Sequence, residues 1–231
     1  MNSRQEDILQ ALIEQYISSG SPVSSGLIAQ QAGLNVSSAT VRNEFAALEE
    51  DDYIQQPHTS AGRLPTEKAY HWYITRLNNR PIDNQVNTDL VEWFDHLGIT
   101  EFKQVAKQLA GLTNLAVFWQ HGDDVYCTGL TNLWQQPEYN QHQVLCDLSA
   151  TIDRLDEIIN QIFVDLPSTT QVLLGAESPF GRTASVIITK YDSDQGSGVI
   201  GILGPWRMDY DRNLRIIKYI NNKLSYGQKK R

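Results

Sequence analysis

Apolar residues near the start of the chain recur at the three- and four-residue spacing of an amphipathic helix. We expect a first helix to begin at a capping box formed by Ser3 and Glu6 and to end near Gly20. A second, shorter helix is predicted between a capping Ser24 and a terminating Gly33. The chain therefore opens with two helices joined by a short turn.

A third helix is predicted to begin at Ser37, in the run SSATVRNEFAALEE. Wound at 3.6 residues per turn, this run places Val41, Phe45 and Leu48 on one face. The opposite face carries Ala39, Arg42, Asn43 and Ala46. This helix is thus expected to bury one side and to expose small polar groups and one arginine on the other.

The run YIQQPHTSAGRLP follows as two short extended pieces around a turn that contains Gly62, and it closes at Pro65. This pattern predicts a β-hairpin. Thr66 then caps a fourth helix. Three helices followed by a hairpin predict a winged helix-turn-helix domain over residues 1–78.

A polar run around Pro81 marks the domain boundary, and a helical linker region is expected over 79–112, with helices at about Val86–Leu97 and Thr100–Leu112. In 113–231, NLAVFWQ and VYCTGL are predicted to pair as a hairpin, and one amphipathic helix is expected over HQVLCDLSATIDRLDEIINQIF. Three further strand-like runs and a closing helix from Asp209 complete the pattern. The expected fold class is α+β.

The composition favours a folded protein of one or two domains, with 41% hydrophobic residues in a chain of 231. Two cysteines, Cys127 and Cys146, are too few for a disulfide scaffold or a cysteine-based zinc site. No apolar run approaches the roughly 18 residues that a membrane span needs. We therefore expect a soluble cytoplasmic protein without membrane contact.

Acidic residues outnumber basic ones, 27 to 19, and the formal net charge is −8. Residues 1–80 alone carry six Lys or Arg against nine Asp or Glu, a net of −3. Because such a surface repels phosphate at long range, any nucleic-acid function depends on local groups. The acids from Glu49 to Asp52 are expected to be a solvated surface run. We expect few phosphate contacts per subunit and binding as a dimer.

The start of the third helix and the hairpin offer groups suited to DNA, because a helix fits the major groove and its first turns meet bases and phosphates. The candidate DNA-binding residues are Ser37, Ser38, Ala39, Thr40, Arg42 and Asn43 on the helix, and His58, Thr59, Ser60 and Arg63 in the hairpin. Arg42 suits a guanine edge or a phosphate, and Asn43 suits adenine. Arg63 is the strongest candidate in the hairpin. A capped helix start and a solvated turn explain the same local features, and the order of the elements favours DNA binding.

Catalytic motifs are missing from the sequence. The histidines lack HExxH spacing, and the chain has no GxSxG elbow or P-loop. We therefore expect no enzymatic activity, no catalytic residues, no metal and no cofactor. Two alternatives stay open: a ligand-sensing regulator, with Trp119, Tyr126, Trp134 and Trp206 lining a pocket, and a winged-helix protein-interaction module without a DNA role.

The run SSATVRNEFAALEEDDY (Ser37 to Tyr53) resembles the recognition-helix signature of the heat-inducible transcription repressor HrcA family. QPHTSAGRLPTEKAYHWYI, YCTGLTNLWQQPEY and GILGPWRMDY resemble further segments of the same family. The resemblance implies a winged-helix domain followed by a GAF-like antiparallel-sheet domain with flanking helices. It also implies a homodimer that represses chaperone genes at an inverted-repeat operator in double-stranded DNA, with the chaperonin as a further partner.

The sequence departs from the family pattern in three places, one of which is Phe45 in place of a common methionine. NLAVFWQ is followed almost at once by VYCTGL, where family members usually insert a further domain that contributes to dimerisation. This chain is thus expected to be a short form without that insertion. Asp52 stands where the family often has glycine, so we expect it to adopt the left-handed backbone conformation.

Overall fold

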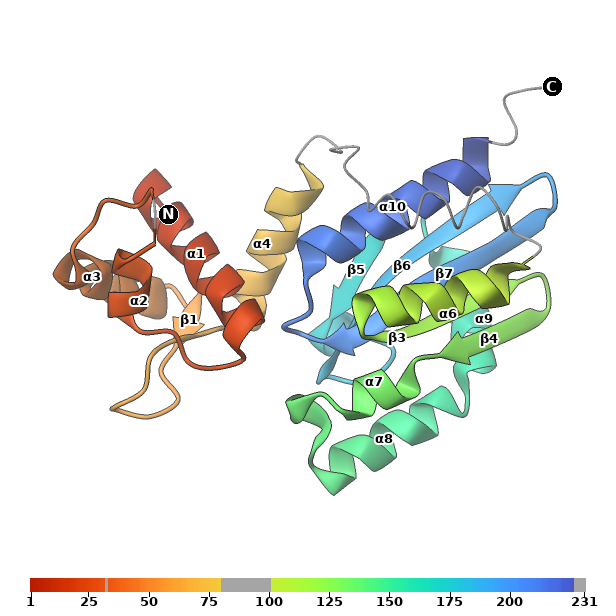
Figure 1. Cartoon of the computed structure of the whole chain (residues 1–231), viewed down its shortest axis with the longest axis horizontal. Helices are drawn as coiled ribbons and strands as arrows, with labels where there is room; N and C mark the ends of the chain where they lie inside the picture. Colours follow the sequence, from red (N-terminus) through yellow and green to blue (C-terminus); the bar gives the residue numbers. More distant parts are fainter. Residues whose placement is uncertain (32, 80–100, 227–231) are drawn as a thin grey trace. The chain divides into compact units, whose positions relative to one another are not determined.

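The computed structural model describes residues 1–31, 33–79 and 101–226, in two compact units, Met1–Arg80 and Pro81–Arg231 (Figure 1). The predicted helix at about Val86–Leu97 lies outside the described residues. No helix within those described ranges is long and apolar enough to cross a membrane.

Unit 1 contains the predicted sequence of three helices, a hairpin and a fourth helix. Its elements are α1 (Ser3–Ser19), α2 (Ser25–Ala29), α3 (Ser38–Glu50), β1 (Ile54–Gln55), β2 (Leu64–Pro65) and α4 (Glu67–Asn78). The two strands pair antiparallel, Ile54 with Pro65 and Gln55 with Leu64. Ser24 and Thr66 cap α2 and α4 through their side-chain oxygens, as predicted.

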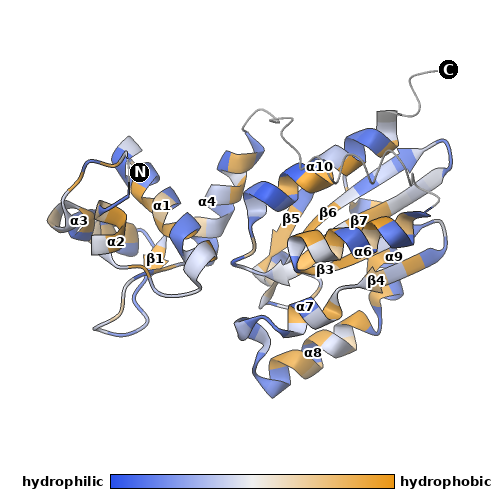
Figure 2. Ribbon diagram, in the orientation of Figure 1, coloured by the Kyte–Doolittle hydropathy of each residue, from blue (hydrophilic) through white to orange (hydrophobic). Residues whose placement is uncertain are grey.

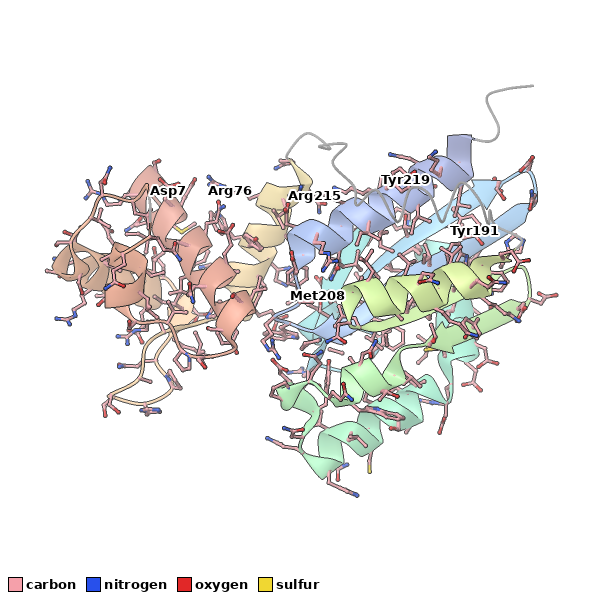
Figure 3. All side chains as sticks on the ribbon, viewed as in Figure 1. Asp7, Arg76, Tyr191, Met208, Arg215 and Tyr219 are labelled. Carbon is pink, nitrogen blue, oxygen red and sulfur yellow. The ribbon has the colours of Figure 1, made fainter. Side chains whose placement is uncertain are left out.

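The predicted capping box at Ser3 and Glu6 is wrong by one residue. Asn2 is the N-cap of α1: its side chain accepts the Gln5 N–H at 2.9 Å, and the Gln5 side chain accepts the Asn2 N–H at 2.9 Å. Asparagine and glutamine satisfy the unpaired amides in the same way as serine and glutamate. Glu6 is thereby free to pair with Arg76 of α4 at 2.7 Å, and Arg76 also points toward Asp7 (Figure 3).

The apolar face of α3 packs into the core of unit 1 as its periodicity predicts. Val41, Phe45 and Leu48 are all buried. Burial of three large apolar side chains stabilises the unit by several kcal/mol, at about 1.5 to 3 kcal/mol each. These contacts fix the rotation of α3 about its axis and so decide which residues it exposes.

Unit 2 is built on one antiparallel sheet with strand order β4-β3-β7-β6-β5. The strands are β3 (Ala116–His121), β4 (Asp124–Thr128), β5 (Gln171–Leu174), β6 (Ala184–Ser193) and β7 (Gly196–Pro205). The helices are α6 (Phe102–Thr113), α7 (Leu130–Trp134), α8 (His142–Ile152), α9 (Leu155–Asp165) and α10 (Tyr210–Tyr226). This arrangement confirms the α+β class and the predicted β3–β4 hairpin.

Helices cover both faces of this sheet. One apolar cluster joins Phe118, Val186 and Leu203 of the sheet to Leu148 of α8 and Ile159 of α9. The helices α6 and α10 lie across the other face, where they alternate between hydrophobic and hydrophilic residues (Figures 1 and 2). The described part of the expected linker region, from Glu101, forms α6 and packs on β3.

The single helix predicted over 142–163 is instead two helices, α8 and α9. The chain leaves the helical conformation at Arg154, where φ is −111° and ψ is 27°. Leu148, Leu155 and Ile159 continue one helical spacing across the break, and all three are buried. Periodicity alone therefore gives no sign of the interruption.

Candidate nucleic-acid interface

The hydroxyl groups at the start of α3 are used within the fold. Ser37 is the N-cap residue, and its Oγ accepts the Thr40 N–H at 3.1 Å. The Ser37 and Thr40 hydroxyls also lie 2.9 Å apart. Ser38 Oγ lies 3.0 Å from Ser25 Oγ, which links α3 to α2. These predicted site residues hold the helix end in place.

Ala39, Arg42 and Asn43 form the exposed part of the same helix end. All three lie opposite the buried Val41 and Phe45, as predicted. The Arg42 and Asn43 side chains make no hydrogen bond or ion pair with any residue that the structure describes. Their donors are therefore available to a ligand.

His58, Thr59 and Ser60 lie exposed in the loop between β1 and β2. His58 Nδ1 lies 3.2 Å from Ser60 Oγ, and the Ala61 N–H donates to the His58 carbonyl at 2.9 Å. The Gln56 side chain donates from Nε2 to the carbonyls of Thr59 and Ala61, each at 3.0 Å. The tip is thus a structured turn.

Arg63 stands apart from the other candidate residues. Its side chain is 19% exposed and pairs with Glu49 of α3, with Nη2 3.0 Å and Nε 3.1 Å from Oε2. Its backbone N–H and carbonyl both bond to Val23, at 2.8 and 2.9 Å. The structure therefore places Arg63 at the base of the loop, away from the exposed tip.

The expectation that the whole acidic run from Glu49 is solvated is wrong for Glu49 itself. This residue is partly buried, and its second oxygen, Oε1, accepts the Gln56 N–H at 3.1 Å. Its partners lie seven and fourteen residues away in the sequence. Local patterning cannot show this contact, because it exists only once the hairpin folds back against α3.

Gly62 allows the loop to approach the segment before α2. A Cβ atom at this position would lie 2.4 Å from both the carbonyl carbon and the carbonyl oxygen of Val23. It would lie 2.8 Å from the carbonyl carbon of Pro22. Real side chains do not come so close to backbone atoms. The close approach therefore requires glycine at position 62.

The end of α3 is closed in the way the sequence suggests. Asp52 has φ of +59°, the left-handed conformation predicted for it. The Thr66 hydroxyl donates to the Asp52 carbonyl at 2.7 Å, and Lys68 Nζ donates to the Asp51 carbonyl at 2.7 Å. Unpaired carbonyls at a helix C-terminus attract such donors. The hairpin and α4 are thereby tied to α3.

Unit 2 uses its distinctive residues mainly for packing. Trp119 is fully buried and donates from Nε1 to the Tyr191 hydroxyl at 3.0 Å, whereas Trp134 of α7 is 37% exposed. Arg207 pairs with Glu138, which joins the two family-like segments LWQQPEY and PWRMDY. Among the described residues, no group of three or more His, Cys, Asp or Glu side chains could hold a metal ion.

The comparisons with known proteins identify relatives of one kind. The family model "HrcA protein C terminal domain" matches residues 34–214. The heat-inducible transcription repressor HrcA of Thermoanaerobacter sp. (strain X514) is 38% identical over 120 residues, which cover 49% of this chain and 34% of that protein. The chain thus aligns with about a third of that relative's length.

The HrcA of Dehalococcoides mccartyi (strain BAV1) is 24% identical over 329 residues, covering 97% of this chain and 95% of that protein. Since this chain has 231 residues, that relative carries residues without a counterpart here. A crystal structure of a hypothetical protein has the same fold, with a TM-score of 0.81, 20% identity and 99% coverage of both chains. By its sequence, the chain belongs to the HrcA family of heat-inducible transcription repressors, a class that is not enzymatic in general.

Proposed function

We propose that this chain is a sequence-specific DNA-binding repressor in which unit 1 is a winged helix-turn-helix domain. In this proposal α3 is the recognition helix, and the wing is the loop of residues 56–63 with its flanking strands β1 and β2. The observation that carries the proposal is the exposed end of α3, where Arg42 and Asn43 have no partner among the described residues. Unit 2 is the GAF-like domain that accompanies it.

The exposed groups match the chemistry of the major groove. An arginine can bind the O6 and N7 atoms of guanine together, and an asparagine can bind N6 and N7 of adenine. Ala39 and Ala46 are exposed on the same side of α3 and suit contact with a thymine methyl group. The positive end of the α3 dipole adds attraction for phosphate.

The exposed tip of the wing suits a different kind of contact. His58, Thr59 and Ser60 carry short polar side chains on a turn that is already ordered, so little entropy is lost on binding. Such groups position a protein on phosphates or enter the minor groove without reading much sequence. We propose that the tip sets affinity and that α3 sets sequence preference.

Charge favours a repressor that acts as a homodimer. With six basic and nine acidic side chains in residues 1–80, one copy offers few phosphate contacts. Two copies on an inverted repeat double the contacts and fix the half-site spacing at about 34 to 36 Å or a multiple of it. The resemblance of the sequence to the HrcA family implies heat-shock and chaperone genes as targets, with the chaperonin as a partner that controls activity.

Selection from a library of random DNA duplexes tests this function. We expect the full chain to enrich an inverted repeat and native mass spectrometry to find two chains on each selected duplex. The half-sites should lie about one helical turn apart, or a multiple of it, because two recognition helices enter successive major grooves. A library that stays random after repeated rounds would contradict DNA recognition, and enrichment of a single half-site bound by one chain would contradict the dimer.

A further inference from the structure

We propose that Glu49 is a positioning residue for DNA binding, which holds the wing in the orientation that DNA requires. The inference rests on the proposed function and adds to it an acidic residue that supports DNA binding without touching DNA. It also assigns Arg63 to the interior of the wing, as the partner of Glu49.

The Glu49 carboxylate ties both ends of the wing loop to the recognition helix. Gln56 is the first residue after β1, and its backbone N–H donates to Oε1 at 3.1 Å. Arg63 is the last residue before β2, and its guanidinium donates to Oε2 at 3.0 and 3.1 Å. Charge-assisted bonds of this kind are about twice as strong as neutral ones. One side chain of α3 thus fixes where the loop leaves and re-enters the hairpin.

The same network extends to the exposed tip through Gln56. The Gln56 backbone is held by Glu49, and its side chain holds the carbonyls of Thr59 and Ala61 at 3.0 Å each. A continuous set of hydrogen bonds therefore runs from α3 to His58, Thr59 and Ser60. Without Glu49, these residues would have to be ordered at the moment of binding, and affinity would fall accordingly.

Bulk electrostatics predicts the opposite sign for the loss of Glu49. Unit 1 is already acidic, and removing one negative charge from a surface near DNA should strengthen binding slightly. Glu50 provides a matched control, since it follows Glu49 on α3, is exposed and makes no ion pair or hydrogen bond through its side chain with the described residues. Glu49→Gln and Glu50→Gln change the charge equally, but only the first breaks the network.

Arg63 supplies an independent second test. If its guanidinium serves Glu49, both Arg63→Gln and Glu49→Gln remove the ion pair between the two side chains. The double variant then binds DNA no more weakly than Glu49→Gln alone. An arginine that neutralises a phosphate instead makes the two effects add. Removing such an arginine makes the negative slope of log K against log salt concentration less steep by about 0.9.

The experiment measures binding of the full chain to a selected duplex by fluorescence anisotropy at several salt concentrations. We expect Glu49→Gln to bind roughly five- to tenfold more weakly than wild type, the size expected from ordering one or two loop side chains on binding. The affinity of Glu50→Gln should stay within about twofold of wild type, because salt screens the interaction of an exposed charge with DNA. Arg63→Gln should weaken binding no more than Glu49→Gln does, because it leaves the bond from the Gln56 N–H to Glu49 in place, and it should keep the wild-type salt slope.

Amide hydrogen exchange of the free protein gives a readout that needs no DNA. We expect faster exchange at Gln56 and Ala61 in Glu49→Gln than in Glu50→Gln, with unchanged exchange in the α3 core. Gln56→Ala, which keeps the charge, should weaken binding in the same direction if Glu49→Gln proves too unstable to measure.

Binding by Glu49→Gln that equals or exceeds that of Glu50→Gln would overturn the inference, as would additive effects of Glu49→Gln and Arg63→Gln. If the wild-type chain showed no preference between DNA sequences, the proposed function would be overturned instead. The amide hydrogen exchange of the free protein would still decide whether Glu49 orders the wing.

Discussion

At the scale of single residues, Arg42 and Arg63 show how far the sequence determines a binding residue. Both arginines stand among polar residues in segments that suit DNA contact. The apolar spacing of α3 places Arg42 on the exposed side, and the structure agrees. Arg63 pairs with an acid fourteen residues away, so its surroundings depend on a tertiary contact that no local pattern contains.

The two cysteines lead to a prediction of contrasting reactivity. Burial raises the pKa of Cys127 to about 11, whereas Cys146 is exposed on α8. Because the thiolate is the reactive form, iodoacetamide at pH 8 should label Cys146 and leave Cys127 intact in the native protein. Peptide mapping by mass spectrometry checks this, and equal labelling rates at the two sites would contradict the described packing of β4.

The same shift in pKa has a consequence for stability. Because the native state disfavours the Cys127 thiolate, burial of the neutral thiol contributes to the free energy of unfolding. This contribution is fully present below the ordinary thiol pKa of 9.0. It is lost as the pH rises from about 9 through about 11. Unfolding by urea should therefore require less denaturant at pH 10.5 than at pH 8, and Cys127→Ala should reduce that difference.

At the scale of elements, the sequence determined the type of nearly every helix and strand that the structure describes. Periodicity located α3 and its buried face, and strand-like apolar runs located β6 and β7. The short helix α7 was not predicted, and three further features were missed for physical reasons. Asn2 is the N-cap in place of Ser3, because asparagine and serine both cap helices well. The break at Arg154 leaves the spacing of apolar residues intact. Glu49 makes its contacts only with the folded hairpin.

Gly62 yields a prediction about the wing as an element. Its missing side chain lets the loop lie against Val23, and Gly62→Ala would force backbone atoms apart. We expect a loss of about 1 to 3 kcal/mol of stability, as for other overpacked sites, together with weaker DNA binding. Thermal denaturation and anisotropy measure the two effects.

Gly111→Ala in α6 is the matched control, because nothing lies within 4 Å of the added methyl group. Alanine in a helix interior should stabilise the protein by up to about 1 kcal/mol. If Gly62→Ala has the same melting temperature and the same affinity for DNA as Gly111→Ala, the loop does not depend on its contact with Val23.

At the scale of the whole molecule, a net charge of −8 rules out long-range attraction to DNA as the source of affinity. In the proposed function, DNA binding therefore depends on a small surface, the exposed end of α3 and the wing tip, repeated in a second copy of the chain. The relative with residues absent here shows that this chain lacks part of the larger family members.

The most direct test of this account is the ratio of affinities for a selected duplex and a scrambled duplex of the same composition. Arg42→Ala should lower that ratio by about 1 to 3 kcal/mol, or roughly 5- to 150-fold, because in the proposed function Arg42 contacts a base edge. Arg182→Ala, which removes another exposed arginine, in unit 2, should leave the ratio unchanged. An unchanged ratio in Arg42→Ala would contradict the claim that the end of α3 recognises DNA sequence.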